Sequence, residues 1–149
     1  MNVRLAGPED AEDVARLLVA FRDWYGKDQP PYESFLASVR RIMATDGGEY
    51  LLGGAPAAGV AQIRYRHSVW TGADDCWLED LFVVEEARRT GLGRALLDGV
   101  IARARERGCR RVELDVDEGN AAAQALYASV GFYSSKRPGE RVFFMQLKL

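Results

Sequence analysis

A short stretch rich in arginine and glycine offers the clearest chemistry in this sequence. Gly91 and Gly93 follow an apolar run at residues 77–84 and precede a segment whose apolar residues recur at helical spacing. Because glycine has no Cβ to hold a ligand away, the N–H groups of residues 89–94 can converge at the positive end of this predicted helix. The pattern predicts a site for a phosphate or pyrophosphate.

Two other phosphate-binding motifs do not match this stretch. A P-loop requires Gly-Lys-Ser/Thr, whereas Gly93 is followed by Arg94 and Ala95. A dinucleotide-binding fingerprint requires a third glycine three positions after the second, where this chain has Leu96. What remains is the pattern Arg88-x-x-Gly-x-Gly between a predicted strand and a predicted helix.

A second motif follows further along the chain and reads N-x-x-A-x-x-L-Y-x-x-x-G-F from Asn120 to Phe132. The first motif resembles the acetyl-CoA signature of the GNAT N-acetyltransferase superfamily, Gln/Arg-x-x-Gly-x-Gly/Ala, and the second resembles its other signature. The two occur in the family's order and at a similar separation. The resemblance covers roughly Trp77 to Phe132 and implies acetyl transfer from acetyl-CoA to an amine.

The resemblance also implies where acetyl-CoA binds. In the GNAT fold the fourth and fifth strands are parallel and splay apart, so that the pantetheine arm completes the ladder between them. By motif position, the backbone of Phe82 and Val83 would hold pantetheine, with the Val83 N–H polarising the thioester carbonyl. Asn120 is expected to cap a helix and to contact the pantetheine arm. The residues expected to hold the pyrophosphate are Arg88, Arg89, Thr90, Gly91, Leu92, Gly93 and Arg94.

Transfer to an amine further requires a general base and a general acid. An alkylammonium has a pKa of about 10, so roughly one molecule in a thousand is a nucleophile at neutral pH until a base removes its proton. The motif position of Tyr127 implies that its phenol protonates the departing CoA thiolate. The structural alternative for Tyr127 is an aromatic side chain that faces the core from a helix.

The run Trp-Leu-Glu-Asp-Leu-Phe-Val-Val resembles the corresponding strand of the spermidine/spermine (diamine) N-acetyltransferases, whose glutamate acts as the base through water. This similarity favours Glu79 as the base and makes Asp80 a structural partner or a substrate ligand. Because strand positions alternate, we expect one of these two carboxylates to face the cleft. The alternative for Glu79 is an ion pair with an arginine of the sheet.

Acids and aromatic residues gather between the first two predicted helices, and they suit an organic cation through ion pairs and cation–π contacts. An ordinary helix end would have much the same composition. We expect the acceptor, a small polyamine-like or amino-acid-like primary amine, to be bound by Asp23, Trp24, Tyr25, Tyr32 and Asp80. The alternatives are a protein, peptide or antibiotic amine, and an acetyl-CoA-sensing domain without turnover. The similarity to diamine acetyltransferases ends in the N-terminal half, where acceptor specificity lies.

Hydrophobic periodicity supplies the elements that must hold these residues. Strands are predicted near residues 2–6, 49–52, 59–65, 77–84, 112–116, 132–135 and 142–149. Helices are predicted near residues 8–25, 33–45, 92–107 and 121–130, and a loop is predicted at residues 67–75. The result is an α/β (α+β) fold, with a mixed, mostly antiparallel sheet of six to seven strands flanked by about four helices. This agrees with the GNAT fold, with its splay between the fourth and fifth strands.

Composition narrows the remaining possibilities. With 149 residues, 48% of them hydrophobic, the chain is expected to be one domain over residues 1–149. A net charge of −2 argues against a nucleic-acid partner. No leader or membrane-length apolar run opens the chain, and Cys76 and Cys109 are expected to be reduced, so we expect a cytoplasmic protein without a membrane partner.

Three further expectations concern partners and mechanism. No cluster has metal-ligand spacing, so no metal is expected. Since nothing near Cys76 marks it as activated, transfer should be direct, without a covalent enzyme intermediate. Many GNAT proteins dimerise, and the apolar segment Phe143–Leu149 could serve as a homodimer interface.

Overall fold

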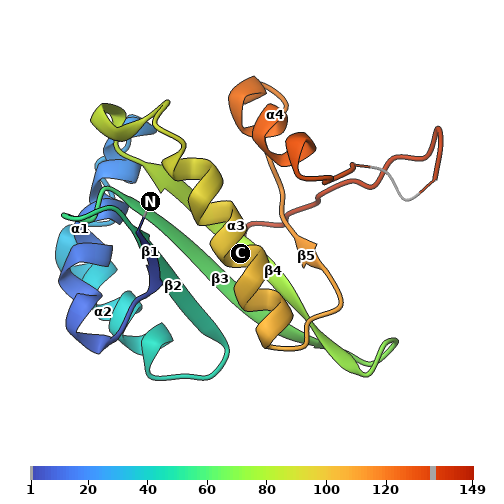
Figure 1. Cartoon of the computed structure of the whole chain (residues 1–149), viewed down its shortest axis with the longest axis horizontal. Coiled ribbons are helices and arrows are strands. Elements are labelled where there is room, and N and C mark those ends of the chain that lie inside the picture. Colours follow the sequence, from blue (N-terminus) through green and yellow to red (C-terminus); the bar gives the residue numbers. More distant parts are fainter. Residues whose placement is uncertain (1, 135–136) are drawn as a thin grey trace. The chain divides into compact units, whose positions relative to one another are not determined.

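The computed structural model describes residues 2–134 and 137–149. The chain divides after Leu114 into two compact units (Figure 1). The first unit contains the sheet and three helices, and the second contains the fourth helix and the C-terminal segment. The expectation of a single domain over residues 1–149 stays a prediction.

The described residues form one five-stranded sheet in the order β1-β2-β3-β4-β5. The strands are β1 Val3–Leu5, β2 Gly48–Gly53, β3 Gly59–Ser68, β4 Ala73–Val83 and β5 Val112–Glu113. All neighbours are antiparallel except β4 and β5, which are parallel. The predicted mixed, mostly antiparallel sheet is confirmed, but the prediction of six to seven strands is wrong.

The C-terminal part accounts for the difference in strand number. Residues 132–134 and 142–149 are not strands, although both segments were predicted to pair as a closing hairpin; Ser135 lies outside the described residues. Apolar side chains from Val142 to Leu149 are exposed. An apolar run becomes a strand only where a neighbouring strand pairs with its backbone, and within the first unit the edge strand β5 is two residues long. A homodimer through this segment stays a prediction.

The β3–β4 hairpin is longer than predicted. Its strands stay paired as far as Ser68 and Ala73, so most of the predicted loop at residues 67–75 is strand. At this end of the hairpin the side chains of His67, Val69 and Trp70 are exposed. Hydrophobic alternation, which marks a strand with one buried face, is therefore missing from the sequence there.

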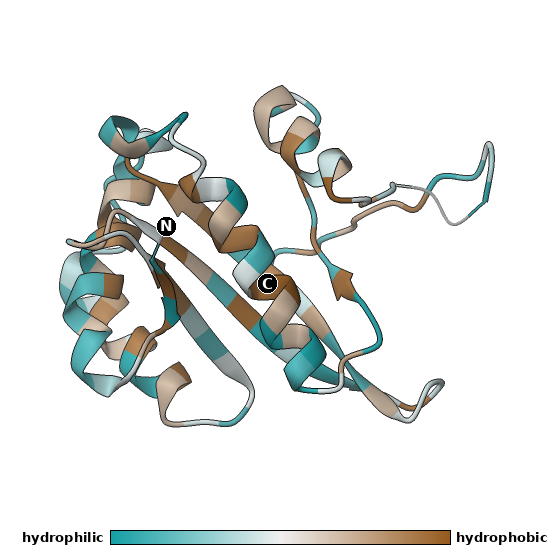
Figure 2. Ribbon diagram, in the orientation of Figure 1, coloured by the Kyte–Doolittle hydropathy of each residue, from teal (hydrophilic) through white to brown (hydrophobic). Residues whose placement is uncertain are grey.

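Four helices are present in the described residues, as predicted: α1 Ala11–Trp24, α2 Tyr32–Met43, α3 Leu92–Glu106 and α4 Ala121–Ser129. Helices α1 and α2 cover one face of the sheet (Figure 1), where Val14, Leu17 and Val39 form a core with Tyr50 and Phe82. Helix α3 covers the other face. Figure 2 shows hydrophobic and hydrophilic bands alternating along α3, as expected of a helix with one buried side.

Helix α3 lies close to the sheet at both of its ends. At its start, a Cβ on Gly53 would come within 2.7 Å of Leu92, and a Cβ on Gly59 within 2.8 Å of Leu96. Near its end, Glu49 of β2 accepts hydrogen bonds from Arg103 Nη2 at 2.6 Å and from the hydroxyl of Tyr65 at 2.7 Å. These contacts fix where the first turn of α3 meets the sheet.

Because Gly59 has no room for a side chain, Gly59→Val should lower the free energy of unfolding by about 1–3 kcal/mol through overpacking. Urea denaturation followed by circular dichroism measures the change. Gly47→Val is the matched control, since a Cβ there would meet one atom at 3.9 Å. Equal stabilities of the two variants would show that the close approach of α3 does not require a glycine at position 59.

Candidate active site

The turn between β4 and α3 presents a row of backbone N–H groups. Arg89 and Gly91 both have positive φ angles, 61° and 89°. Residues in this left-handed conformation, placed next to ordinary ones, form a concave nest of N–H groups that binds anions. In the part of the chain that the structure describes, the N–H groups of residues 89–93 donate no backbone hydrogen bond. They lie at or just before the start of a 15-residue helix, where a negative charge is favoured.

The turn holds its own shape. The Thr90 hydroxyl donates to Ala87 O at 2.7 Å, and the N–H of Arg88 donates to Glu85 O at 3.1 Å. Because the Arg88 N–H already donates to Glu85 O, it is removed from the predicted set of backbone donors to a pyrophosphate. The strained φ of Arg89, a non-glycine residue, is of the kind that often occurs at binding sites.

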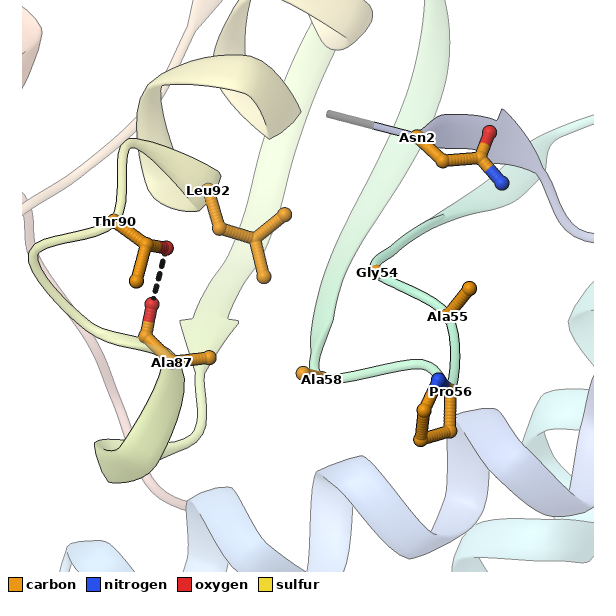
Figure 3. A pocket seen from close by; sticks show the side chains of 8 residues that line it. All are labelled: Asn2, Gly54, Ala55, Pro56, Ala58, Ala87, Thr90 and Leu92. Atoms are coloured by element: carbon orange, nitrogen blue, oxygen red, sulfur yellow. Dashed lines mark hydrogen bonds between the residues drawn. The ribbon is translucent and has the colours of Figure 1, made fainter.

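A cavity of about 320 Å³ lies beside this turn. Figure 3 shows the turn residues Ala87, Thr90 and Leu92 facing residues of the β2–β3 hairpin, namely Gly54, Ala55, Pro56 and Ala58. Apart from Thr90 and Asn2, its lining side chains are apolar, so the cavity offers an anion few partners. The N–H groups of residues 89–93 remain the better anion donors.

Strand β4 has an open edge that leads to the turn. It pairs with β5 at Cys76 and Trp77 alone, so within residues 2–114 no strand pairs with this edge from Leu78 to Val83. The N–H of Val84 donates to Ala58 O at 2.9 Å on the β3 side. The backbone N–H and C=O groups of successive residues point to opposite edges of a strand. The N–H and C=O of Val83 therefore point to the open edge. A strand-like ligand could pair there, as predicted for pantetheine.

Arg88 reaches back from the turn to this edge. Its Nε donates to Val83 O at 2.9 Å, and its guanidinium carbon lies 5.3 Å from the centre of the Trp24 ring and 5.7 Å from that of Phe82. The side chain therefore links the end of β4 to the end of α1. The C=O of Val83 already has a donor, which leaves its N–H directed at the open edge.

A β-bulge lies at the two candidate bases, Glu79 and Asp80. Asp80 pairs with Gln62 while Leu78 pairs with Ile63, so that Glu79 is an extra residue in β4. The expectation of simple alternation is wrong at this point, because a bulge inserts one residue and redirects the side chains around it. Glu79 is exposed, and Asp80 is half-buried opposite the buried Gln62.

Sequence reasoning missed one polar group near these carboxylates. Tyr50 of β2 is buried, and burial raises the pKa of its phenol to about 12, with the negative charges of Asp80 and Glu79 adding to the effect. The phenol therefore stays protonated at neutral pH. No sequence signal could single it out, because a tyrosine in a predicted strand is an ordinary core residue.

The predicted acceptor residues are only partly brought together. The rings of Trp24 and Tyr25 are in contact, 5.0 Å between centroids, and each residue is about half exposed. Phe21 stacks on Tyr25 at 5.1 Å and on Phe82 at 4.9 Å, which connects this cluster to the end of β4. Asp23 is paired with the guanidinium of Arg22 at 2.7 Å. Tyr32 lies apart in sequence at the start of α2 and is half-buried, and Asp80 lies in the sheet.

The second unit contains the remaining predicted residues. Asn120 accepts a hydrogen bond from the N–H of Ala123 at 3.2 Å, so its predicted role as the N-cap of α4 is confirmed. Tyr127 is half-buried within α4, and its ring lies 5.7 Å from that of Phe132. The predicted catalytic role of Tyr127 stays a prediction that rests on its place in the motif.

Cys76 is buried, which raises the pKa of its thiol to about 12 and disfavours the reactive thiolate. Across residues 2–134 and 137–149, no three His, Cys, Asp or Glu side chains are grouped so as to hold a metal ion. The helices of these residues include none with the length and apolar character to cross a membrane.

Comparison with known proteins decides the family. The model of the "Acetyltransferase (GNAT) family" matches residues 9–132, more than half of the chain. The chain belongs to the GNAT acetyltransferase family. It is therefore an N-acetyltransferase, and acetyl-CoA is the acetyl donor of this family. The resemblance noted in the sequence is confirmed at this level.

Several GNAT proteins resemble this one over its whole length or over part of it. Aminoglycoside N(6')-acetyltransferase type 1 of Stenotrophomonas maltophilia is 29% identical and covers 99% of this chain and 94% of its own. The crystal structure of a proposed acetyltransferase from Arthrobacter sp. FB24 has a TM-score of 0.91 at 28% identity, covering 100% of this chain and 96% of its own. The [ribosomal protein bS18]-alanine N-acetyltransferase of Escherichia coli K12 is 44% identical over 40% of each chain.

The conformation of the turn gives a test of acetyl-CoA binding by this GNAT protein. Gly91→Ala adds a Cβ where φ is 89°, and the strain of about 1–2 kcal/mol should shift the nest and raise the Kd for acetyl-CoA about tenfold. Isothermal titration calorimetry measures the Kd for acetyl-CoA of each variant. Gly108→Ala carries similar strain, at φ 74° with no atom within 4 Å, and should leave the Kd unchanged. An unchanged Kd in Gly91→Ala would place the pyrophosphate elsewhere.

Proposed function

We propose that this protein transfers an acetyl group directly from acetyl-CoA to a small primary amine. The observation that carries the proposal is the open edge of β4, which ends at Val83 and is followed within a few residues by the nest of N–H groups at residues 89–93. A pantetheine arm paired along the edge would carry its pyrophosphate to the nest. The thioester carbonyl would then meet the N–H of Val83.

The chemistry needs one proton removed and one supplied. Glu79, exposed at the bulge, would take a proton from the ammonium, directly or through water. The neutral amine would attack the thioester carbon, the negative charge on the oxygen would be met by the Val83 N–H, and the C–S bond would break. Tyr127 would give its phenolic proton to the departing thiolate. The raised pKa of the buried Cys76 thiol favours this direct transfer over an acetyl-cysteine intermediate.

The acceptor that we propose is polyamine-like or amino-acid-like. Its support is the pair of carboxylates at the bulge, which attract an ammonium group, and the half-exposed rings of Trp24 and Tyr25 near the end of β4. The Leu-Glu-Asp strand is similar to that of the diamine acetyltransferases. An antibiotic amine or a protein N-terminus is the alternative, because relatives named for aminoglycosides and for a ribosomal alanine resemble this chain. A domain that senses acetyl-CoA without turnover would need neither carboxylate. A cytoplasmic location remains our expectation.

Thiol release from acetyl-CoA across polyamines, diamines, amino acids, aminoglycosides and short peptides tests the function. We expect saturable turnover on one amine class. Tyr127→Phe should lower kcat by about 10²-fold or more, because it removes the proton donor, while the Kd for acetyl-CoA stays unchanged. Unchanged turnover in this variant would remove Tyr127 from the mechanism. Tight binding of acetyl-CoA with no turnover on any amine would favour the sensing domain.

The two carboxylates at the bulge can be separated in the same assay. Glu79→Gln should lower kcat about 10²-fold, because the group that would accept the proton of the ammonium is gone. Asp80→Asn, one residue away, should raise the KM for the amine more than it lowers kcat. If Asp80→Asn instead shows the larger loss of kcat, the base is Asp80.

A further inference from the structure

Arg88 lies at a junction of three parts of the first unit. Its backbone immediately precedes the nest at residues 89–93, its Nε donates to Val83 O at 2.9 Å, and its guanidinium faces the ring of Trp24 at 5.3 Å. Nearby Arg94, by comparison, is paired with Asp98 at 3.1 Å. Arg88 has no carboxylate at ion-pair distance among the described residues, so its contacts are with a carbonyl and with aromatic rings.

The hydrogen bond to Val83 has a chemical consequence at the open edge. Without Arg88, the C=O of Val83 would be a free acceptor beside the Val83 N–H, which is the group that the thioester oxygen requires. A ligand could then pair with either group. Because Arg88 already donates to this carbonyl, one of its two acceptor sites is occupied, whereas the N–H of Val83 remains for a ligand. An acyl-CoA that pairs here would therefore be favoured in the register that puts its carbonyl oxygen on that N–H.

The contact with Trp24 extends the effect to the end of α1. Trp24 is 51% exposed and is held by Tyr25, Phe21 and Arg88 rather than by burial. A guanidinium over an indole ring is attracted to the negative face of the ring, which is enough to change the population of one orientation of a half-exposed ring several-fold. Whatever orders the backbone of residues 88–93 will thus also order Trp24.

We propose that Arg88 is a positioning residue that couples the acetyl-CoA turn to the acceptor wall, by which we mean the exposed sides of Trp24 and Tyr25. The inference rests on the proposed function, because it takes the nest as the pyrophosphate site and the wall as the amine site. Acetyl-CoA that binds at the nest fixes the backbone of Arg88. The guanidinium then holds Val83 O on one side and Trp24 on the other, so that the first substrate prepares the site for the second.

The coupling between the acetyl-CoA turn and the acceptor wall can be measured without an amine acceptor. Titration with CoA should change the fluorescence of the wild-type protein, and Trp24→Phe should lose that change, which assigns it to Trp24 rather than to Trp70 or Trp77. Arg88→Met keeps the aliphatic stem but removes the planar cation. It should bind CoA within about threefold of the wild type and lose at least half of the fluorescence change. Arg105→Gln, an exposed arginine later in α3, is the matched control and should behave as the wild type.

The kinetic signature separates positioning from phosphate binding and from a structural role. Arg88→Gln keeps an N–H donor for Val83 O but loses the contact with Trp24, so we expect the KM for the best amine of the panel to rise about tenfold while the KM for acetyl-CoA changes less than threefold. Trp24→Leu should raise the amine KM similarly, and the double variant should add little. If the Arg88 variants fail to fold, Trp24→Leu with its fluorescence partner Trp24→Phe carries the test.

Four results would overturn the inference. A rise in the Kd for CoA with an unchanged amine KM would make Arg88 a phosphate ligand. Behaviour of Arg88→Met and Arg88→Gln equal to that of Arg105→Gln would leave Arg88 without a role in the reaction. Failure of the wild type to bind CoA would overturn the proposed function and this inference together, whereas binding and turnover without coupling would overturn the inference alone.

Discussion

Unpaired backbone groups at the junction of β4 and α3 are the constraint around which the first unit is built. The N–H groups of residues 89–93 and the edge of β4 beyond Trp77 have no backbone partner within this unit. Such groups normally find partners, so their clustering marks a place where a ligand completes the structure. The glycines that let α3 approach the sheet, and the ion pair between Glu49 and Arg103 near its far end, hold the junction in place without filling it.

The parts of this site that sequence predicted are local ones. Gly91 at the start of α3 and Asn120 at the start of α4 act through their own backbone or through residues one turn away. Residues close by in the sequence are therefore enough to predict their roles in the local structure. The bulge at Glu79 is different, because it is a mismatch between two strands and depends on the register of β3. The lengths of β5 and of the β3–β4 hairpin likewise depend on pairing partners, which hydrophobic periodicity does not reveal.

The bulge explains how a strand under two helices can present two acids. In a regular strand, Glu79 and Asp80 would lie on opposite faces, and one carboxylate would be directed against α3. The inserted residue bends β4 where it leaves β5, and Glu79 emerges exposed while Asp80 stays opposite Gln62. Neutral polar groups, the Gln62 amide and the Tyr50 phenol, line the buried side. The buried tyrosine adds no charge there because the pKa of its phenol is about 12.

Charge is distributed unevenly between the bulge and the end of α1, and this bears on how an amine would lie in the proposed reaction. At the end of α1, Arg88 occupies one side of Trp24, Lys27 lies 5.7 Å from the centre of the Tyr25 ring, and Asp23 is already paired. A further cation gains less there, since Asp23 is paired with Arg22 and each ring already has one cation beside it. Glu79 and Asp80 precede Val83 in β4 by three to four residues, about 10 Å by the rise of a strand. An acceptor would therefore direct its ammonium to the bulge and its apolar part to Trp24, which is the orientation that brings its nitrogen toward the base.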